Sequence, residues 1–282
     1  MAIPTPAGQP GAMSPKPSLA ITWRRHGFMP SRRRYPLYLS LLLAIGILFR
    51  AAPGHADVNV DLLYDIRHTT DPQDNANNFP VVELKLFFPQ SFGSFLMKEE
   101  IDLDGANHNP SQIYTELSQS IKLGDATLWD KPLFLHLGYS GGLGVFGAPS
   151  GGFYIQNAFQ WGLEYPLQVH GAFCNAFVAL RYTTFEKPSY DPMIALYAGR
   201  SFFNYKLLIA NSLEAWTTSK DQGNAATRQD SGKYASWELE SEVWYKVAKD
   251  FSVGTYVRTT RNVYATDDRW VVYPSVGVRY SF

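Results

Sequence analysis

The stretch YPSVGVRYSF, Tyr273 to Phe282, alternates apolar and polar side chains up to the last residue. Successive side chains of a β-strand point to opposite faces, so residues two apart share a face. One face would carry Val276, Val278, Tyr280 and Phe282, and the other Ser275, Gly277, Arg279 and Ser281. A strand of this pattern that ends on Phe is typical of a barrel that closes by pairing its last strand with its first.

The same two-residue period recurs from Asp57 onward, and no helical period of 3.6 residues is sustained. About twelve segments show it: residues 58–66, 82–88, 95–103, 113–123, 133–139, 159–165, 172–183, 191–199, 204–216, 237–247, 250–261 and 273–282. Segments of this length suit tilted strands that cross a bilayer, and an even number of strands brings both ends to one side. The sequence therefore predicts an all-β fold for residues 57–282: an antiparallel transmembrane β-barrel of about 12 strands.

The links between these segments alternate in length. Counted from a periplasmic N-terminus, the odd-numbered links are mostly long and polar or rich in glycine: residues 68–79, 104–111, 141–152, 184–190, 217–232 and 262–269. The links between them are mostly shorter: residues 89–94, 166–171, 200–203 and 248–250, with 124–131 as the exception. Long external loops and short periplasmic turns are the arrangement of bacterial outer-membrane barrels.

Alternation alone does not say which face is the inside. A soluble barrel such as a lipocalin shows the same pattern, with its apolar residues inside. Two features favour the membrane barrel: Tyr and Trp gather near the predicted strand ends, and the other face is crowded with charge.

Residues 1–56 contain seven of the 25 basic residues and no acidic one, so the rest of the chain has 18 basic and 25 acidic residues. Arg32-Arg33-Arg34 precede the apolar run Leu37–Phe49, and Gly54-His55-Ala56 follows it, which is the order of a secretory signal. The run is too short for a membrane-spanning helix, which needs about 20 residues. We predict an N-terminal extension plus a cleavable signal peptide in residues 1–56, with Met29 as an alternative start and a signal-anchor as the alternative reading.

The polar face supplies the candidate channel-lining residues: Asp61, Asp65, Arg67, Glu83, Lys85, Tyr114, Glu116, His136, Arg181, Trp216, Glu238, Glu240, Arg258 and Arg279. The same face would also hold the acids Glu100, Asp102, Glu164, Glu214 and Glu242 and the bases Lys98, Lys122, Lys206 and Lys246, so that the two signs nearly balance. Charges leave water only when they are paired or hydrogen-bonded, so we expect many of these to be structural ion pairs. Three carboxylates on one face, at 238, 240 and 242, would repel unless they meet a basic wall or a cationic solute.

Neither catalysis nor a metal site is indicated, and we predict no enzyme and no cofactor. The histidines after residue 56 are His68, His108, His136 and His170, and none is followed two residues later by the Ser of the twelve-stranded outer-membrane phospholipase. The acids Asp71, Asp74, Asp267 and Asp268 in the predicted loops could bind calcium, but scattered loop acids are usually only solvated. The net charge of −7 after residue 56 disfavours nucleic acid as a partner.

Three stretches resemble the nucleoside-specific channel-forming outer-membrane proteins, the Tsx-like and OmpK-like group: PLFLHLGYSGGLG (Pro132–Gly144), SWELESEVWYKVAKDFSVG (Ser236–Gly254) and YPSVGVRYSF. The resemblance extends thinly over most of the chain after residue 56. It implies a monomeric twelve-stranded barrel with a narrow channel for nucleosides and similar small solutes, and external loops that phages or colicins use.

We therefore expect passive, selective diffusion of small solutes, nucleosides first, across the bacterial outer membrane. Asp61, Arg67, Glu116 and Arg181 would hold the polar edge of the solute, and Tyr114 and Trp216 would offer stacking faces. Tyr280 and Phe282 would be read by the barrel-assembly machinery. The alternative is a closed structural or adhesive barrel whose external loops bind partners without transport.

Overall fold

The structure, a computed structural model, describes residues 56–282 except 74, 76, 106–107, 146–151, 170, 224–226, 229 and 264–268. The predicted extension and signal peptide therefore lie, apart from Ala56, outside the described residues. The strands are β1 (Asp57–Asp65), β2 (Phe79–Gln90), β3 (Gly93–Asp102), β4 (Gln112–Leu128), β5 (Lys131–Val145), β6 (Gly152–Val169), β7 (Ala172–Thr183), β8 (Ser189–Phe202), β9 (Leu207–Ser219), β10 (Lys233–Lys246), β11 (Phe251–Arg261) and β12 (Val271–Ser281).

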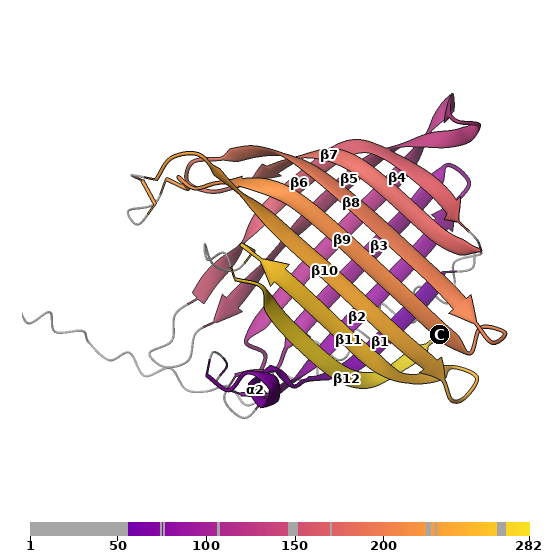
Figure 1. Cartoon of the computed structure of the whole chain (residues 1–282), viewed down its shortest axis with the longest axis horizontal. Coiled ribbons are helices and arrows are strands. Elements are labelled where there is room, and N and C mark those ends of the chain that lie inside the picture. The colour runs from indigo at the N-terminus through magenta and orange to yellow at the C-terminus, as the bar shows by residue number, and fades with distance from the viewer. Residues whose placement is uncertain are drawn as a thin grey trace, which may run out of the picture. The chain divides into compact units, whose positions relative to one another are not determined.

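The twelve strands form one closed barrel in which each strand pairs with its neighbours in sequence and β1 pairs with β12 (Figure 1). Every pairing is antiparallel, and the closing pair runs from Asn59↔Ser281 to Asp65↔Ser275. At the end of the closing strand, the backbone N–H of Phe282 donates to the carbonyl of Val58 at 3.0 Å. The predicted closed antiparallel barrel and its strand number are confirmed.

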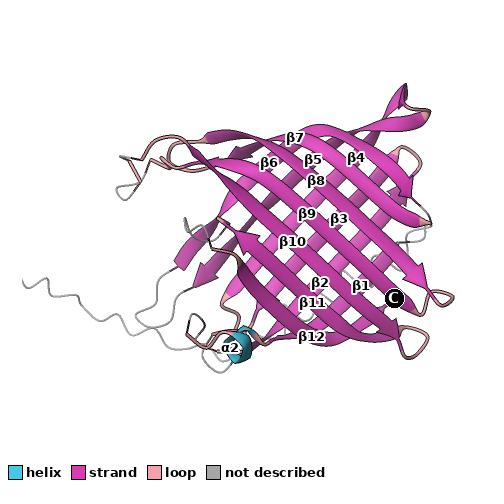
Figure 2. Cartoon of the chain, viewed as in Figure 1, coloured by secondary structure: helices cyan, strands magenta, loops and turns pink. Residues whose placement is uncertain are grey.

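The links alternate in length as predicted. The short turns lie at the end of the barrel that holds the C-terminus, and the longer links lie at the other end (Figure 1). The first long link contains the short helix α2 (Arg67–Thr70), which the period analysis did not predict (Figure 2). Within the described part of the chain, no helix is long and apolar enough to cross a membrane.

The predicted long link at residues 124–131 is wrong. Strand β4 continues to Leu128 past an irregularity between Lys122 and Thr127, and β5 begins at Lys131. The turn consists of Trp129 and Asp130, both with positive φ (47° and 61°), as a two-residue hairpin turn of type I′ requires. Gly124 and Asp125 suggested a turn in the sequence, but they lie inside the hairpin, which extends beyond its neighbours at the upper right of Figure 1.

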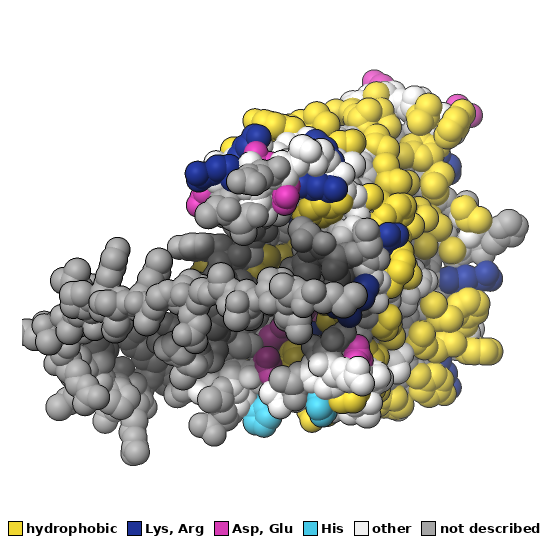
Figure 3. Space-filling model, turned by 60° about the vertical axis from the view of Figure 1, so that its left-hand side comes forward, with side chains coloured by type: hydrophobic (Ala, Val, Ile, Leu, Met, Phe, Trp, Pro, Cys, Tyr) yellow, Lys and Arg dark blue, Asp and Glu magenta, His cyan; other side chains and the backbone are white. Residues whose placement is uncertain are grey.

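The apolar face of the strands points out of the barrel. Leu62, Val178, Ile194 and Val276 are 53%, 58%, 55% and 45% exposed, and apolar side chains cover the barrel wall in Figure 3. Charged side chains gather instead at the loop end in that view and at the opposite rim. This arrangement is the reverse of a soluble barrel, which fills its interior with apolar residues.

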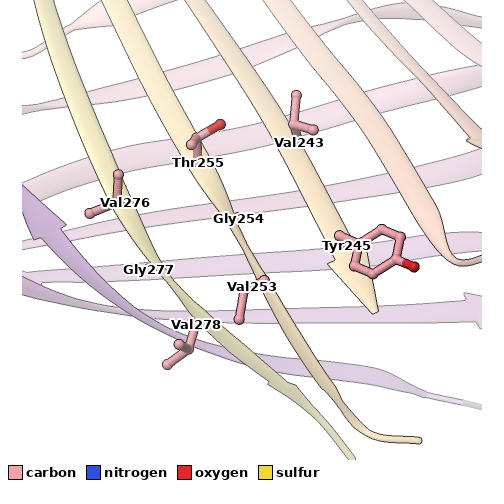
Figure 4. Close-up of a pocket in the computed structure, with 8 residues that line it drawn as sticks. All are labelled: Val243, Tyr245, Val253, Gly254, Thr255, Val276, Gly277 and Val278. Atoms are coloured by element: carbon pink, nitrogen blue, oxygen red, sulfur yellow. The ribbon is translucent and has the colours of Figure 1, made fainter. Parts of the chain in front are cut away.

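A shallow depression of about 530 Å³ interrupts the outer face across β10, β11 and β12 (Figure 4). Its lining includes the side chains of Val243, Val253 and Val276 and the backbone of Gly254. A Cβ at Gly254 would lie 2.2 Å from the carbonyl oxygen of Val243 and 2.6 Å from the ring of Trp244. The absence of a Cβ at Gly254 therefore leaves room for the buried Trp244 ring beside β11.

Candidate functional site: the lumen of the barrel

The strand register brings the predicted channel-lining residues together on the inner face. Residues that pair across neighbouring strands share a face, and one such row runs through Arg279, Asp61, Glu83, Glu100 and Tyr114. Other pairs on this face are Lys85↔Lys98, Lys98↔Glu116, Ser120↔His136, Arg181↔Asp191, Met193↔Trp216, Glu214↔Glu238 and Glu240↔Arg258. Thirteen of the fourteen predicted residues lie on these strands, and Arg67 lies on α2.

Ion pairs cross the lumen between strands that are not neighbours. Lys98 Nζ on β3 lies 2.7 Å from Glu240 Oε1 on β10, and Lys85 on β2 pairs with Glu242 on β10. Arg258 on β11 pairs with Glu100 on β3, although β2, β1 and β12 separate these two strands in the sheet. These contacts, which we call the cross-lumen ion pairs, fill the side of the interior between β1–β3 and β10–β12.

Two of the three carboxylates of β10 face a basic wall. Glu240 contacts Lys98 and also accepts hydrogen bonds from Tyr256 Oη and Arg258. Glu242 contacts Lys85, and its Oε2 lies 2.8 Å from Arg279 Nη2. Of the two possibilities left open above, the basic wall is confirmed for 240 and 242.

Arg279 fastens the closing strand from inside. Its Nε and Nη2 donate to the two oxygens of Asp61 at 2.7 and 2.6 Å, and its guanidinium lies 4.2 Å from the ring centroid of Trp244. Asp61 is 1% exposed and Arg279 6% exposed, so the pair is removed from bulk water. A bidentate, charge-assisted pair is the strong form of such a contact.

The opposite wall, β4 to β9, carries carboxylates held by hydroxyl, amide and imidazole groups. Glu164 Oε2 accepts from Ser120 Oγ at 2.6 Å and lies 2.9 Å from His136 Nδ1, while its Oε1 accepts from Asn175 at 2.7 Å. The His136 ring stacks on Phe177 with centroids 4.0 Å apart. Ser120 therefore bonds the carboxylate rather than His136, and the group lacks the nucleophile–base contact of a hydrolase.

Next to this group, Glu116 and Glu214 also have hydroxyl partners. Tyr114 Oη donates to Glu116 at 2.9 Å, and Tyr197 Oη donates to Glu214. Glu116 and Glu214 are close enough to interact electrostatically with each other. This wall thus carries negative charge beside aromatic rings.

Further along the same wall, the Arg181 guanidinium lies 4.7 Å from the ring centroid of Trp216. Glu238, the third carboxylate of β10, pairs across the strands with Glu214, two residues from Trp216 along β9, and lies 3.6 Å from Arg258 Nε. Of the three carboxylates of β10, Glu238 therefore has the longest contact with a basic side chain.

At the loop end, Arg67 ties α2 to the rim of the barrel. It donates to Asp65 Oδ2 at 2.9 and 2.6 Å, and its guanidinium lies between the rings of Phe79 (4.7 Å) and Tyr273 (4.3 Å). Burial of the Arg67 guanidinium lowers its pKa, but the hydrogen bond and the negative charge of Asp65 have the larger effect, so that the pKa is raised. Across the rim, Asp191 accepts from Thr217 and Lys233, both at 2.8 Å.

The register keeps Lys122 and Lys246 on the predicted inner face, since Lys122 pairs with Phe134 next to Glu164 and Lys246 pairs with Ser252 next to Arg279. Both are exposed near the turns, and Lys206 lies in the turn between β8 and β9. The sequence analysis did not name the inward residues Tyr197, Tyr256 and Asp191, although their alternation with outward residues could have identified them.

Among the described residues, no cluster of His, Cys, Asp and Glu could hold a metal ion; Asp74, Asp267, Asp268 and His170 lie outside them.

Comparisons with known proteins give structural neighbours but no family. No protein-family model matches the chain, and no curated protein matches it in sequence. Similar solved structures include a KdgM porin (TM-score 0.44, 12% identity, 79% of this chain and 99% of that chain) and a NanC porin (0.46, 11%, 80% and 100%). The translocator domain of the autotransporter NalP from Neisseria meningitidis is also similar (0.40, 10%, 88% and 95%). Similarity at this level identifies no solute, and the resemblance to nucleoside channels stays a prediction.

Proposed function

We propose that the chain is a barrel of the bacterial outer membrane that lets small polar solutes diffuse passively through its lumen, nucleosides first. The observation that carries the proposal is a closed barrel with an apolar outer face and a charged inner face. In lipid, backbone groups must be satisfied within the protein, which a closed barrel achieves, and the outer face then contacts acyl chains. Charged side chains inside are consistent with water in the lumen.

The path for solutes lies along the wall of β4 to β9, because the cross-lumen ion pairs occupy the other side. Along this wall the rings of His136, Phe177 and Trp216 lie beside the carboxylates of Glu164 and Glu214. Aromatic faces stack on planar rings, and carboxylates accept hydrogen bonds from sugar hydroxyls. A nucleoside combines both chemistries, which supports the choice suggested by the sequence resemblance.

Single-channel recording in planar bilayers tests the proposal. Purified barrel should produce discrete conductance steps, and adenosine should reduce them. Trp216→Ala should weaken the block by adenosine, whereas Trp161→Ala, which removes an outward ring of the same size that is 38% exposed, should leave it unchanged. Folded protein that never conducts would refute the channel. Liposome swelling with nucleosides, sugars and amino acids would then rank the solutes.

A second candidate, a closed barrel whose external loops bind phages, colicins or other partners, is favoured by the cross-lumen ion pairs, which block part of the interior. Folded, inserted protein without conductance would support this candidate.

The proposed export signal is tested separately. Cleavage after Ala56 predicts that N-terminal sequencing of protein from outer membranes finds Asp57 as the first residue.

A further inference from the structure

We propose that the lumen selects cationic and neutral solutes and excludes anions. The inference rests on the proposed channel function and extends it to the class of solute: nucleosides would pass, but nucleotides and acidic oligosaccharides would not. It follows from how the inward charges are paired over the whole lumen.

The first step is that the basic side chains of the lumen between the rims, apart from Arg181, contact carboxylates. Lys98 meets Glu240, and Lys85 lies 2.6 Å from Glu83 as well as against Glu242. Two of the three arginines each contact more than one carboxylate: Arg258 contacts Glu100 and Glu240, and Arg279 contacts Asp61 and Glu242. These bases offer little positive charge to a solute.

The second step is that the other wall carries more carboxylates than bases. Arg181 interacts electrostatically with Glu214 from this wall, but one base balances only one of the three charges of Glu116, Glu164 and Glu214. The partners of Glu116, Glu164 and Glu214 are the hydroxyls of tyrosines and a serine, the amide of Asn175 and the imidazole of His136. Hydroxyl and amide donors satisfy a carboxylate oxygen without cancelling its charge. The wall that borders the proposed path is therefore the negative one.

The third step is the overall balance. Leaving aside the charges near the two rims (Asp57, Asp65, Asp191, Lys122 and Lys246), the described inward acids number ten and the described inward bases five. The acids are Asp61, Glu83, Glu100, Asp102, Glu116, Glu164, Glu214, Glu238, Glu240 and Glu242, and the bases are Lys85, Lys98, Arg181, Arg258 and Arg279. Four of the ten acids could bind a proton and the described lumen would still be negative.

Fixed charge inside a low-dielectric wall concentrates counter-ions and repels co-ions. The effect is strongest when the salt is dilute, since the Debye length is about 10 Å at 0.1 M and shorter at higher concentration. A narrow, negatively charged lumen should thus discriminate by charge in dilute salt and lose discrimination in concentrated salt.

The test is the zero-current potential of the full barrel in a planar bilayer that separates two KCl concentrations, both at or below 0.1 M. We expect K⁺ to permeate roughly tenfold better than Cl⁻, the low end of what fixed charge in a cleft produces. The double variant Glu116→Gln with Glu214→Gln should lower this ratio several-fold. The matched control is Glu99→Gln: Glu99 lies on the outward face of β3, where it accepts from Thr115, and its loss should leave the ratio unchanged.

Two outcomes would overturn the inference while the channel function stands. One is a K⁺ to Cl⁻ permeability ratio of one or less. The other is a ratio that the double variant leaves unchanged, although the barrel of that variant migrates as folded protein in gels. Absence of conductance would overturn the channel function and the inference with it. Liposome swelling provides a second readout, in which adenosine should enter and adenosine monophosphate should not.

Discussion

Arg279 on β12 and Asp61 on β1 lie opposite each other in the closing strand pair and form a bidentate ion pair at 2.7 and 2.6 Å. The residues are 218 positions apart, so the pair exists only once the barrel has closed. Arg279 also contacts Glu242 on β10 and thereby connects the closing strands to the cross-lumen ion pairs. One side chain thus serves both closure of the barrel and the filling of one side of its lumen.

Removing the Asp61 charge should destabilise the barrel. Asp61→Asn leaves Arg279 buried beside one carboxylate fewer, and breaking a buried ion pair costs about 3–5 kcal/mol. Urea unfolding of the refolded barrel measures the loss. Ser281→Ala is the control, because it removes a neutral hydrogen bond to Asn59 (2.7 Å) in the same strand pair and should cost only about 1 kcal/mol. Equal effects of the two changes would contradict a special role for the ion pair.

Removing a whole cross-lumen ion pair should widen the path. Lys98→Ala combined with Glu240→Ala eliminates both partners, so that neither charge stays behind unpaired, and conductance in bilayers should rise. Either change alone should reduce stability more than the double change, because it leaves a desolvated charge. Unaltered conductance in the double variant would mean that this pair does not border the path.

Glycine is required where β11 passes Trp244. Gly254→Ala would bring a methyl group within 2.6 Å of the ring, and such overpacking typically costs about 1–3 kcal/mol. Gly199→Ala, another strand glycine, meets nothing closer than 3.8 Å and should be nearly neutral. Denaturant midpoints of the two variants provide the comparison. A neutral Gly254→Ala would show that both the Trp244 ring and the backbone at Val243, whose carbonyl oxygen would lie 2.2 Å from the new methyl group, can move.

The β7–β8 and β9–β10 links are joined by an ion pair whose contribution to stability depends on pH. The Lys187 ammonium, 2.7 Å away, and the Gly223 N–H lower the pKa of the Asp221 carboxyl below its ordinary value. A depressed carboxyl pKa contributes stability above the pKa of the unfolded chain, and this contribution is lost as pH falls through the folded value. Lys187→Met should raise the pKa of Asp221, as measured by NMR titration, but only in part, since the Gly223 contact remains. No rise would mean that the pair does not form in solution.

Deletion of Phe282 should impair assembly in the outer membrane. Phe282 is 65% exposed, and its ring packs edge-on against Tyr280 at 4.8 Å, so an assembly factor can reach both rings. The deletion also removes the backbone bond to Val58. Phe282→Tyr keeps an aromatic end and should assemble normally, as judged by the folded band in outer-membrane fractions. Normal assembly of the deletion variant would argue against recognition through this residue.

The pattern of single strands was enough to predict which residues face inward. Because the side-chain period of a strand is two, assigning Asp61 to the lumen also assigns Asn59, Leu63 and Asp65. The turn of β4 and β5 was mispredicted for a local reason: Gly124 and Asp125 are typical turn residues, but here neighbouring strands continue the pairing past them.

The sequence by itself determined the strand period and the apolar and polar faces, since these depend on residues near one another in the chain. Only the tertiary structure decided which charges meet. Lys98 and Glu240, which are 142 positions apart, come together only through the stagger of a closed barrel. That stagger also decides that Lys85, Lys98, Arg258 and Arg279 gather on one side while Glu116, Glu164 and Glu214 remain on the other, and no single strand contains this information.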